Sequence, residues 1–229
     1  MRRRSDNALV FMAKWPEPGR AKTRLCPPLT AEEAAACARA FLLDMLTEAS
    51  FCDADRWLAF APAASHPAFV RLVGSGVGLI EADGADLGAA LRRAQFAAFA
   101  RGYRRVALVA SDIPHLPAAR YADAFAALEE ADVAIGPSGD GGYYLLASKR
   151  ETPLLFDNVP WSTASVLDQT LLQAQRAGLD IRLIPSCDDV DVVGDLTWLE
   201  EQLRRRPGAG HTLSVLEGLH GRVEGVAAD

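Results

Sequence analysis

Short apolar segments that resemble buried strands alternate with helix-like segments along most of this 229-residue chain. The predicted strands span residues 8–13, 56–61, 77–80, 105–110, 132–136, 143–148 and 181–185. The predicted helices span residues 34–49, 86–101, 117–130, 163–177 and 195–206, and a short C-terminal helix follows residues 207–210. This alternation favours an α/β fold in which helices cover a mainly parallel sheet.

One pair of neighbouring strands is expected to be antiparallel. Only six residues separate 132–136 from 143–148, whereas a parallel crossover needs about ten or more residues. No repeat, low-complexity tract or linker divides the chain, so we expect a single domain over residues 1–229 that ends in a helix and tail at 207–229.

Composition and charge exclude several classes of protein. Half of the residues are apolar, which is typical of a globular chain, and the net charge of −6 argues against a nucleic-acid partner. The four cysteines lack metal-site spacing and are expected to be buried, reduced thiols. The apolar run after Met1–Arg4 is too short for a signal peptide, and no segment reaches the length of a membrane span, so we expect a cytoplasmic protein without a membrane partner.

The loop after the first predicted strand is strongly cationic. It carries Lys14, Arg20, Lys22 and Arg24, and Gly19 bends it. Such a loop at the carboxyl end of a strand is where open α/β sheets bind phosphate-bearing ligands. Lysine supplies a point charge and arginine a bidentate fork, so these residues are candidates for anion binding, although a solvated cationic loop would have the same composition.

Carboxylates follow two other predicted strands. Asp112 lies in the segment Ser111-Asp112-Ile113-Pro114 after the apolar strand 105–110, where it is either a hard ligand for Mg²⁺ or Mn²⁺ or a turn residue. Asp189 and Asp191 share one face of extended backbone, so one of them could join Asp112 around a single divalent ion. Asp195 is expected to cap a helix that begins at Leu196.

Two further segments combine polar and aromatic residues. The turn at 136–142 places three glycines around Asp140 and precedes Tyr143, which favours a ligand site over a plain connection. Trp161 could stack on a sugar or base, and Ser162 or Thr163 is expected to cap the following helix. The four histidines share no metal-ligand spacing, and His115 is expected to be a loop residue.

Together these segments resemble a bacterial family of GT-A-fold transferases known as radical-SAM/selenodomain-associated or arsenosugar-biosynthesis-type glycosyltransferases. The resemblance covers roughly residues 8–200, and the chain is more distantly similar to molybdenum-cofactor and phospholactate guanylyltransferases. The segments that carry the resemblance are 14–25, 111–114, 136–144, 160–163 and 189–191. The chain departs from the family pattern at Ala85-Asp86-Leu87-Gly88-Ala89-Ala90, where the family has Gly-Asp-Leu-Gly-Glu-Arg.

The resemblance implies a three-layer GT-A-like sandwich with a nucleotide-binding N-terminal half and an acceptor side at about residues 136–200. Lys14, Lys22 and Arg24 would then hold phosphates, Asp112 and Asp191 would hold the metal, and Asp140 and Trp161 would line the acceptor side. Gly19, Arg20, Asp86 and Tyr143 are further candidates for ligand binding, and Asp189 is an alternative metal ligand.

These expectations describe an Mg²⁺- or Mn²⁺-dependent transferase with a nucleotide-linked donor and a small-molecule acceptor. Glycosyl transfer from a nucleotide-diphospho-sugar is the preferred reaction, with Asp112, Lys22 and Asp140 as catalytic candidates. Nucleotidyl transfer with release of pyrophosphate and non-catalytic nucleotide binding are the alternatives. The identities of base, sugar and acceptor, and the oligomeric state, do not follow from the sequence.

Overall fold

The computed structural model describes residues 3–206 and 209–219, and contacts between Cα atoms divide them into two compact units. The first unit consists of residues 3–14, 49–110 and 117–188. The second unit consists of residues 15–48, 111–116, 189–206 and 209–219. The single domain expected over residues 1–229 stays a prediction, and most of the expected C-terminal tail lies outside the described residues.

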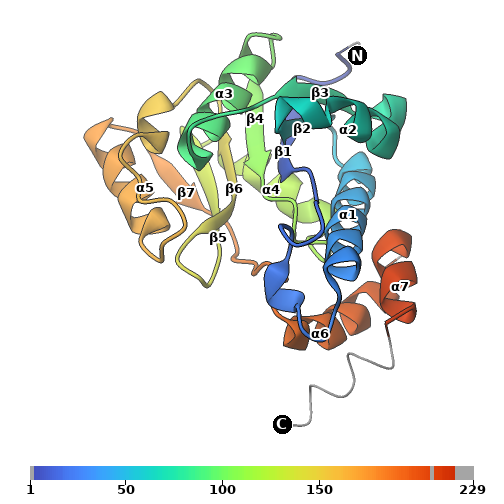
Figure 1. Ribbon diagram of the computed structural model, residues 1–229. Helices are drawn as coiled ribbons and strands as arrows, with labels where there is room; N and C mark the ends of the chain where they lie inside the picture. The colour runs from blue at the N-terminus through green and yellow to red at the C-terminus, as the bar shows by residue number, and fades with distance from the viewer. Residues whose placement is uncertain (1–2, 207–208, 220–229) are drawn as a thin grey trace. The chain divides into compact units, whose positions relative to one another are not determined.

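Seven strands of the first unit form one mixed sheet in the order β3-β2-β1-β4-β6-β5-β7 (Figure 1). They are β1 (Asn7–Lys14), β2 (Asp55–Ala61), β3 (Gly78–Glu81), β4 (Arg105–Val109), β5 (Val133–Pro137), β6 (Tyr143–Ser148) and β7 (Ile181–Leu183). Strand β6 runs antiparallel to its neighbours β4 and β5, and the other pairs are parallel. Val133 faces Ser148 across β5 and β6, which confirms the antiparallel pair expected from their short connection.

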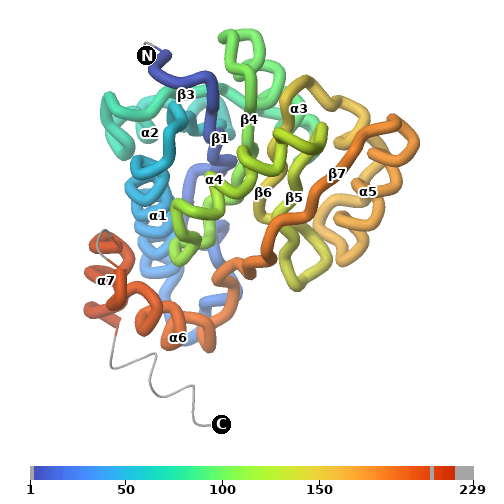
Figure 2. The backbone as a smooth tube through the Cα atoms, turned by 180° about the vertical axis from the view of Figure 1, so that it is seen from behind, coloured from blue at the N-terminus to red at the C-terminus, as the bar shows by residue number. Residues whose placement is uncertain are grey.

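Helices of the first unit flank both faces of this sheet, which confirms the predicted α/β class. They are α2 (His66–Val73), α3 (Leu87–Phe99), α4 (Ala118–Ala127) and α5 (Val166–Arg176), with 3-10 turns η2 (Ala49–Phe51), η3 (Ala63–Ser65), η4 (Gly74–Gly76) and η5 (Pro153–Phe156). Successive side chains of a strand point to opposite faces. Val10 therefore joins a core with Leu91 of α3, while Phe11 meets Tyr121 of α4 edge-on, with ring centroids 6.0 Å apart. In Figure 1, α3 lies in front of the strands. In Figure 2, which shows the opposite side, α4 lies in front of them.

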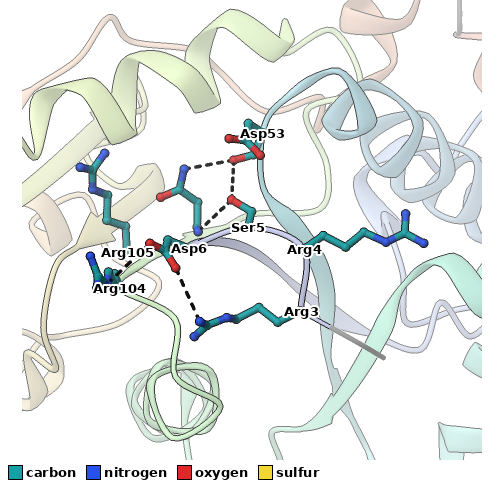
Figure 3. A pocket seen from close by; sticks show the side chains of 8 residues that line it. Arg3, Arg4, Ser5, Asp6, Asp53, Arg104 and Arg105 are labelled. Atoms are coloured by element: carbon teal, nitrogen blue, oxygen red, sulfur yellow. Dashed lines mark hydrogen bonds and ion pairs between the residues drawn. The ribbon is translucent and has the colours of Figure 1, made fainter.

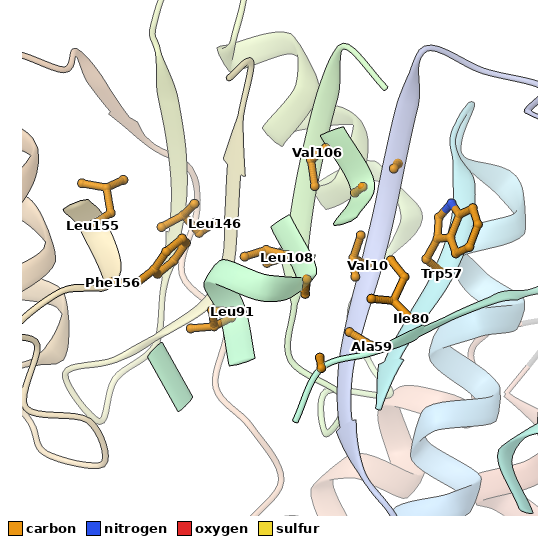
Figure 4. Close-up of a cluster of buried hydrophobic side chains, with 14 of the residues drawn as sticks. Val10, Trp57, Ala59, Ile80, Leu91, Val106, Leu108, Leu146, Leu155 and Phe156 are labelled. Atoms are coloured by element: carbon orange, nitrogen blue, oxygen red, sulfur yellow. The ribbon is translucent and has the colours of Figure 1, made fainter. Parts of the chain in front are cut away.

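The larger core lies between the sheet and α3 (Figure 4). Val10, Leu108 and Leu146 project into it from three adjacent strands and are at most 2% exposed. Full burial of each such side chain contributes about 1.5–3 kcal/mol. This core fixes β1 and β4, whose carboxyl ends lead into segments that carry candidate residues.

At the amino ends of the strands, buried polar groups form a chain of hydrogen bonds. Trp57 Nε1 donates to the hydroxyl of Tyr103 over 2.9 Å, and this hydroxyl donates to Asp55 Oδ2 over 2.8 Å. Burial raises the pKa of Tyr103 to about 12, so this hydroxyl keeps its proton. The network ties β2 to the segment before β4.

A polar cavity of about 530 Å³ opens at the same edge (Figure 3). Its arginines lie beside carboxylates, since Arg3 and Arg104 approach Asp6 at 3.7 and 3.6 Å. The cavity is lined by Arg3, Arg4, Ser5, Asp6, Asn7, Asp53, Arg104 and Arg105. None of these residues is a predicted site residue, so this cavity is separate from the candidate site.

The second unit is helical. It contains η1 (Thr23–Leu25), α1 (Ala31–Glu48), α6 (Val193–Arg204) and α7 (Gly210–Glu217), and its own core includes Leu25, Phe41 and Leu199. A reciprocal capping box begins α1: Glu33 N donates to Thr30 Oγ1, and Thr30 N donates to Glu33 Oε2. No helix among the described residues has both the length and the hydropathy of a membrane span.

Asp44 of α1 is a buried carboxylate, 2% exposed, that meets the start of α7. Its Oδ1 accepts a hydrogen bond from His211 N at 3.1 Å, and its Oδ2 accepts one from Thr212 N at 2.7 Å. The first amide groups of a helix have no partner inside the helix. Asp44 therefore caps α7 from another helix and fixes α7 against α1.

Candidate functional site

Residues from three separate stretches of the second unit meet in one cluster of charges. Lys22 Nζ lies 2.8 Å from Asp112 Oδ2, 3.5 Å from Asp191 Oδ1 and 3.8 Å from Asp189 Oδ2. Arg24 forms an ion pair with Asp191 through Oδ2. These five residues are called the charge cluster below. It brings together the cations and the carboxylates that the sequence suggested from separate loops.

The backbone around the charge cluster explains this convergence. Lys22 adopts a left-handed conformation (φ 46°, ψ 43°) directly before η1, whose Leu25 is fully buried. On the acidic side, Val190 is also fully buried and its N–H donates to the carbonyl oxygen of Asp112 over 3.1 Å. Because Asp189 and Asp191 flank this buried valine, both carboxylates lie on the side that faces Lys22.

The charge cluster is strongly coupled. The side chain of Lys22 is only 10% exposed, so water screens its charge poorly. Burial opposes the charged ammonium, but the carboxylates, with Asp112 foremost, outweigh it and raise the pKa of Lys22. Burial and then the charge of Asp112 raise the pKa of Asp189, against the attraction of Lys22. The carboxylates therefore stabilise the charge of Lys22, whereas burial and the neighbouring Asp112 disfavour the charge of Asp189.

The donor chemistry of the charge cluster fits a hard divalent cation, since carboxylate oxygens are the ligands that Mg²⁺ and Mn²⁺ prefer. Among the described residues, however, no group of three histidine, cysteine or acidic side chains is arranged as a metal centre. The ammonium of Lys22 lies between the carboxylates instead. The residues fit a metal by type, and Lys22 would have to move for one to bind.

The remaining cations of the first loop make weaker contacts. Arg20 is 82% exposed at its side chain and pairs with Glu17 at 3.3 Å. Gly19 has a positive φ of 76° and turns the loop between them. Lys14 is exposed at the last position of β1, in the first unit. Within this loop, Lys22 and Arg24 are thus the cations that pair with carboxylates from distant parts of the chain.

In the first unit, Asp140 is exposed and bonded within its own turn. Its Oδ1 accepts hydrogen bonds from the hydroxyl of Ser138 and from Gly142 N, the latter at 2.9 Å. The hydrogen bond from Ser138 lowers the pKa of Asp140, and the Gly142 amide adds to this effect. A carboxylate with a lowered pKa is a weaker base, so this geometry favours orientation of a ligand over removal of its proton.

The glycines of this turn have structural roles. Gly141 has a φ of +86°, and a Cβ there would lie 2.0 Å from the carbonyl oxygen of Ala164. Gly139 donates its N–H to Asp188 Oδ1 over 2.6 Å, and a Cβ there would lie 2.8 Å from that oxygen. The excess of glycine, from which a ligand site was predicted, is therefore explained by close packing of the turn.

Trp161 and Tyr143 form an aromatic corner in the first unit. Their rings meet edge-on with centroids 6.4 Å apart, and burial raises the pKa of Tyr143. A Cβ on Gly88 in α3 would lie 2.4 Å from Trp161 Nε1. Gly88 is thus needed to admit the indole ring, a role that its unusual place inside a helix pattern could have indicated. Asp86 caps the same helix, because its Oδ1 accepts from Ala89 N at 2.8 Å.

Two predicted helix caps are wrong. Helix α6 begins at Val193, so Asp195 is its third residue, and its carboxylate accepts from Asp191 N and Val192 N at 2.8 and 2.9 Å. Helix α5 begins at Val166, three residues later than expected, because Thr163 Oγ1 donates to the carbonyl oxygen of Pro160 instead. The first of these corrections matters for the site, since Asp195 holds the backbone of Asp191 in place.

Two other expectations concern histidine and cysteine. His115, in the loop after Asp112, is buried and meets the ring of Trp198 edge-on at 4.7 Å. All four cysteines are free thiols, but only Cys37 is fully buried, and the other three are partly exposed. Burial raises the pKa of Cys37 to about 12, which makes this thiol unreactive at neutral pH.

This chain is similar to a known protein family and to several solved structures. The profile of a bacterial family described as "Uncharacterized protein conserved in bacteria (DUF2064)" matches residues 45–163. A candidate nucleotide-diphospho-sugar transferase from Desulfovibrio desulfuricans G20 is 33% identical, with a TM-score of 0.89 over 99% of this chain and 100% of that chain. No curated protein sequence matches the chain.

More distant structures share the fold. A CMP:2-keto-3-deoxy-manno-octonic acid synthetase in complex with CTP is 12% identical, with a TM-score of 0.57 over 88% of this chain and 99% of that chain. The 4-diphosphocytidyl-2C-methyl-D-erythritol synthase from Anaerococcus prevotii DSM 20548 is 7% identical, with a TM-score of 0.56 over the same shares of the two chains. At these identities the likeness establishes the fold alone.

Proposed function

We propose that this chain, which belongs to the bacterial DUF2064 family, is a metal-dependent transferase acting on a nucleotide-activated donor. The charge cluster is the observation that carries this proposal. It combines oxygen ligands for a divalent ion with two cations for phosphate. The 33% identical structure, described as a candidate nucleotide-diphospho-sugar transferase, supports the same class of donor.

In this proposal Asp112 and Asp191 hold Mg²⁺ or Mn²⁺, with Asp189 as the alternative ligand. When bound, the ion neutralises charge on the diphosphate of the donor. Lys22 and Arg24 bind phosphate oxygens and stabilise the negative charge that develops on the leaving group, which is usually the largest catalytic contribution. Gly19 and Arg20 belong to the same phosphate-binding loop, and Lys14 at the end of β1 is a further candidate for phosphate binding.

The acceptor is proposed to bind at Asp140, Tyr143 and Trp161. Asp140 orients an acceptor hydroxyl through its exposed carboxylate, and Tyr143 and Trp161 supply an aromatic wall. A nucleotide contact of Asp86 would use Oδ2, because Oδ1 caps α3. In glycosyl transfer the acceptor oxygen bonds to the anomeric carbon and its hydroxyl proton passes to the leaving diphosphate or to water. The bond from that carbon to phosphate oxygen breaks, and its electron pair stays with the nucleoside diphosphate that leaves.

Charge compensation within the first loop supports a diphosphate donor over a triphosphate. Arg20 is paired with Glu17, and Lys22 and Arg24 are paired with aspartates. The net positive charge around the loop is therefore smaller than its cations alone would give. We therefore propose glycosyl transfer, as in the radical-SAM-associated glycosyltransferases that the chain resembles. Nucleotidyl transfer is the alternative.

A product assay tests the proposal. The protein is incubated with Mn²⁺ and either nucleotide-diphospho-sugars or nucleoside triphosphates, and release of nucleoside diphosphate or pyrophosphate is measured. Nucleoside diphosphate from a nucleotide sugar supports glycosyl transfer, whereas pyrophosphate from a triphosphate replaces it with nucleotidyl transfer. Nucleotide binding that is indifferent to Mn²⁺ and to Asp112→Ala would instead indicate a non-catalytic binding protein.

A further inference from the structure

Lys22 occupies the position that a divalent ion would need, and this gives it a second role at the site. We propose that Lys22 is the resident counter-ion of the carboxylates, and that the divalent cation displaces it toward the phosphates of the donor. Metal and donor then promote each other's binding through one side chain. This inference rests on the proposed function of the site.

The first argument is spatial. Lys22 Nζ lies within 3.8 Å of carboxylate oxygens from Asp112, Asp189 and Asp191. Mg²⁺ binds oxygen at about 2.0–2.1 Å. An ion held by the same oxygens would lie in direct contact with the ammonium, which is itself a cation. The carboxylates therefore bind either the ammonium or the metal.

The second argument is a balance of charge. Lys22 and Arg24 contribute two positive charges and the three aspartates contribute three negative charges, which leaves −1. If Lys22 leaves, Arg24 and the three aspartates carry −2, which one divalent ion neutralises. If Lys22 stayed, the ion would bring the cluster to +1. Departure of Lys22 thus gives the neutral metal-bound cluster.

The third argument concerns where the ammonium goes. Lysine has a flexible four-carbon stem and a compact charge, so its side chain can exchange one anion for another. A diphosphate beside the cluster offers oxygen acceptors to replace the carboxylates. Because coupling between two binding events is reciprocal, the donor then raises the affinity for metal by the same factor as the metal raises the affinity for donor.

The test measures metal affinity in the absence of donor. Binding of Mn²⁺ alone is followed by electron paramagnetic resonance, which reports the free ion, for the full-length wild type and for Lys22→Met. We expect Lys22→Met to bind Mn²⁺ about tenfold more tightly, an effect within the range typical of coupled sites. Lys22→Arg should stay near the wild type, since it retains a cation. Unchanged or weaker Mn²⁺ binding by Lys22→Met would overturn the inference.

A matched control separates this effect from net charge. Lys149→Met removes the same charge from a lysine that pairs with Asp132 at 3.7 Å in the first unit. Its Mn²⁺ affinity should equal that of the wild type. An equal gain in both methionine variants would show a general effect of charge and contradict a special role of Lys22. Thermal unfolding gives a second readout, in which Mn²⁺ raises the melting temperature of Lys22→Met more than that of the wild type.

Binding of inorganic pyrophosphate in the presence of EDTA distinguishes the inference from the proposed function. We expect the wild type to bind pyrophosphate, and Lys22→Met to lose about tenfold in affinity, as for other coupled sites. If Lys22→Met gains affinity for Mn²⁺ but the wild type binds no pyrophosphate either in EDTA or with saturating Mn²⁺, the counter-ion role stands and the proposed diphosphate donor is wrong.

Discussion

The charge cluster and the turn at 136–142 both carry aspartates, but the partners of these carboxylates lie at different distances along the chain. In the charge cluster, Asp112 and Asp191 pair with side chains 90 and 167 positions away along the chain. In the turn at 136–142, Asp140 bonds to groups only two residues away on either side. The first arrangement depends on the whole second unit, whereas the second is completed within one turn.

This contrast shows how an apparent motif can be separated from a site. A carboxylate bonded to its own backbone stabilises a turn, and its sequence neighbours suffice to explain it. Partly buried charges that face partners from distant loops involve a desolvation cost that local structure does not require. The charge cluster is for this reason the stronger candidate for chemistry.

The largest expected effect separates the two regions by activity. Asp112→Asn removes the carboxylate nearest to Lys22 and should lower kcat by about 10²-fold, comparable to loss of one electrostatic contact in other enzymes. Asp140→Asn keeps an oxygen acceptor and should lower kcat by less than about tenfold. Steady-state rates of both variants with the nucleotide sugar found active are the measurement. A larger loss in Asp140→Asn would reverse the ranking of the two regions.

The next effect concerns the stability of the turn. Gly141→Ala forces a side chain into a positive φ and against the backbone of Ala164, so it should destabilise folding by about 2–4 kcal/mol. Gly178→Ala is the matched control, because its φ is +61° but no atom lies within 4 Å of its Cβ. The control should lose only about 1–2 kcal/mol. Equal losses in urea unfolding would show that packing against Ala164 does not matter.

A smaller effect follows from the lowered pKa of Asp140. Since its pKa is lowered on folding from the ordinary value of 3.8, the ionised carboxylate stabilises the fold above that value. This stabilisation is lost as pH falls through the lowered pKa. The free energy of unfolding of Asp140→Asn should therefore lie below that of the wild type at pH 7 and approach it at a pH well below 3.8. Denaturant titrations at both pH values test this, and a constant difference would count against the hydrogen bonds of the turn.

The smallest effect is expected at the exposed edge of the charge cluster. The side chain of Arg24 is 68% exposed, so Arg24→Gln should change the free energy of unfolding by less than about 1 kcal/mol. The difference should shrink in 1 M salt, because salt screens exposed pairs. Chemical denaturation at two salt concentrations measures it. A loss that salt does not reduce would mean that Arg24 is a structural part of the cluster, like Lys22.

Local signals predicted most of the fold. The alternation of strand-like and helix-like segments predicted the α/β class, and a short connection predicted the antiparallel β5–β6 pair. Helix α2 was missed, since it has eight residues with a proline at its start and Phe69 is its only buried side chain. The strand order, with β6 between β4 and β5, depends on packing between distant segments and has no local signal.

The sequence indicated which residues are candidates for the site, but not which of them form ion pairs. The residue types of Lys22, Asp112 and Asp191 pointed to phosphate and metal. Their sequence positions could not show that the ammonium lies among the carboxylates, because that contact joins loops 90 or more residues apart. The ligand role of Asp140 stays a prediction, and the atoms of Asp188 and Ala164 explain Gly139 and Gly141 without a ligand.

The cap that Asp44 provides for α7 has a practical consequence for shortened forms of the protein. A polypeptide that stops at Arg206 would keep Asp44 but lose both amide donors, which lie 167 and 168 positions further along the chain. The same truncation would remove Leu216, which shares a core with Phe41 of α1, and so would expose apolar surface to water. We therefore expect a gene truncated at that codon to yield aggregated material.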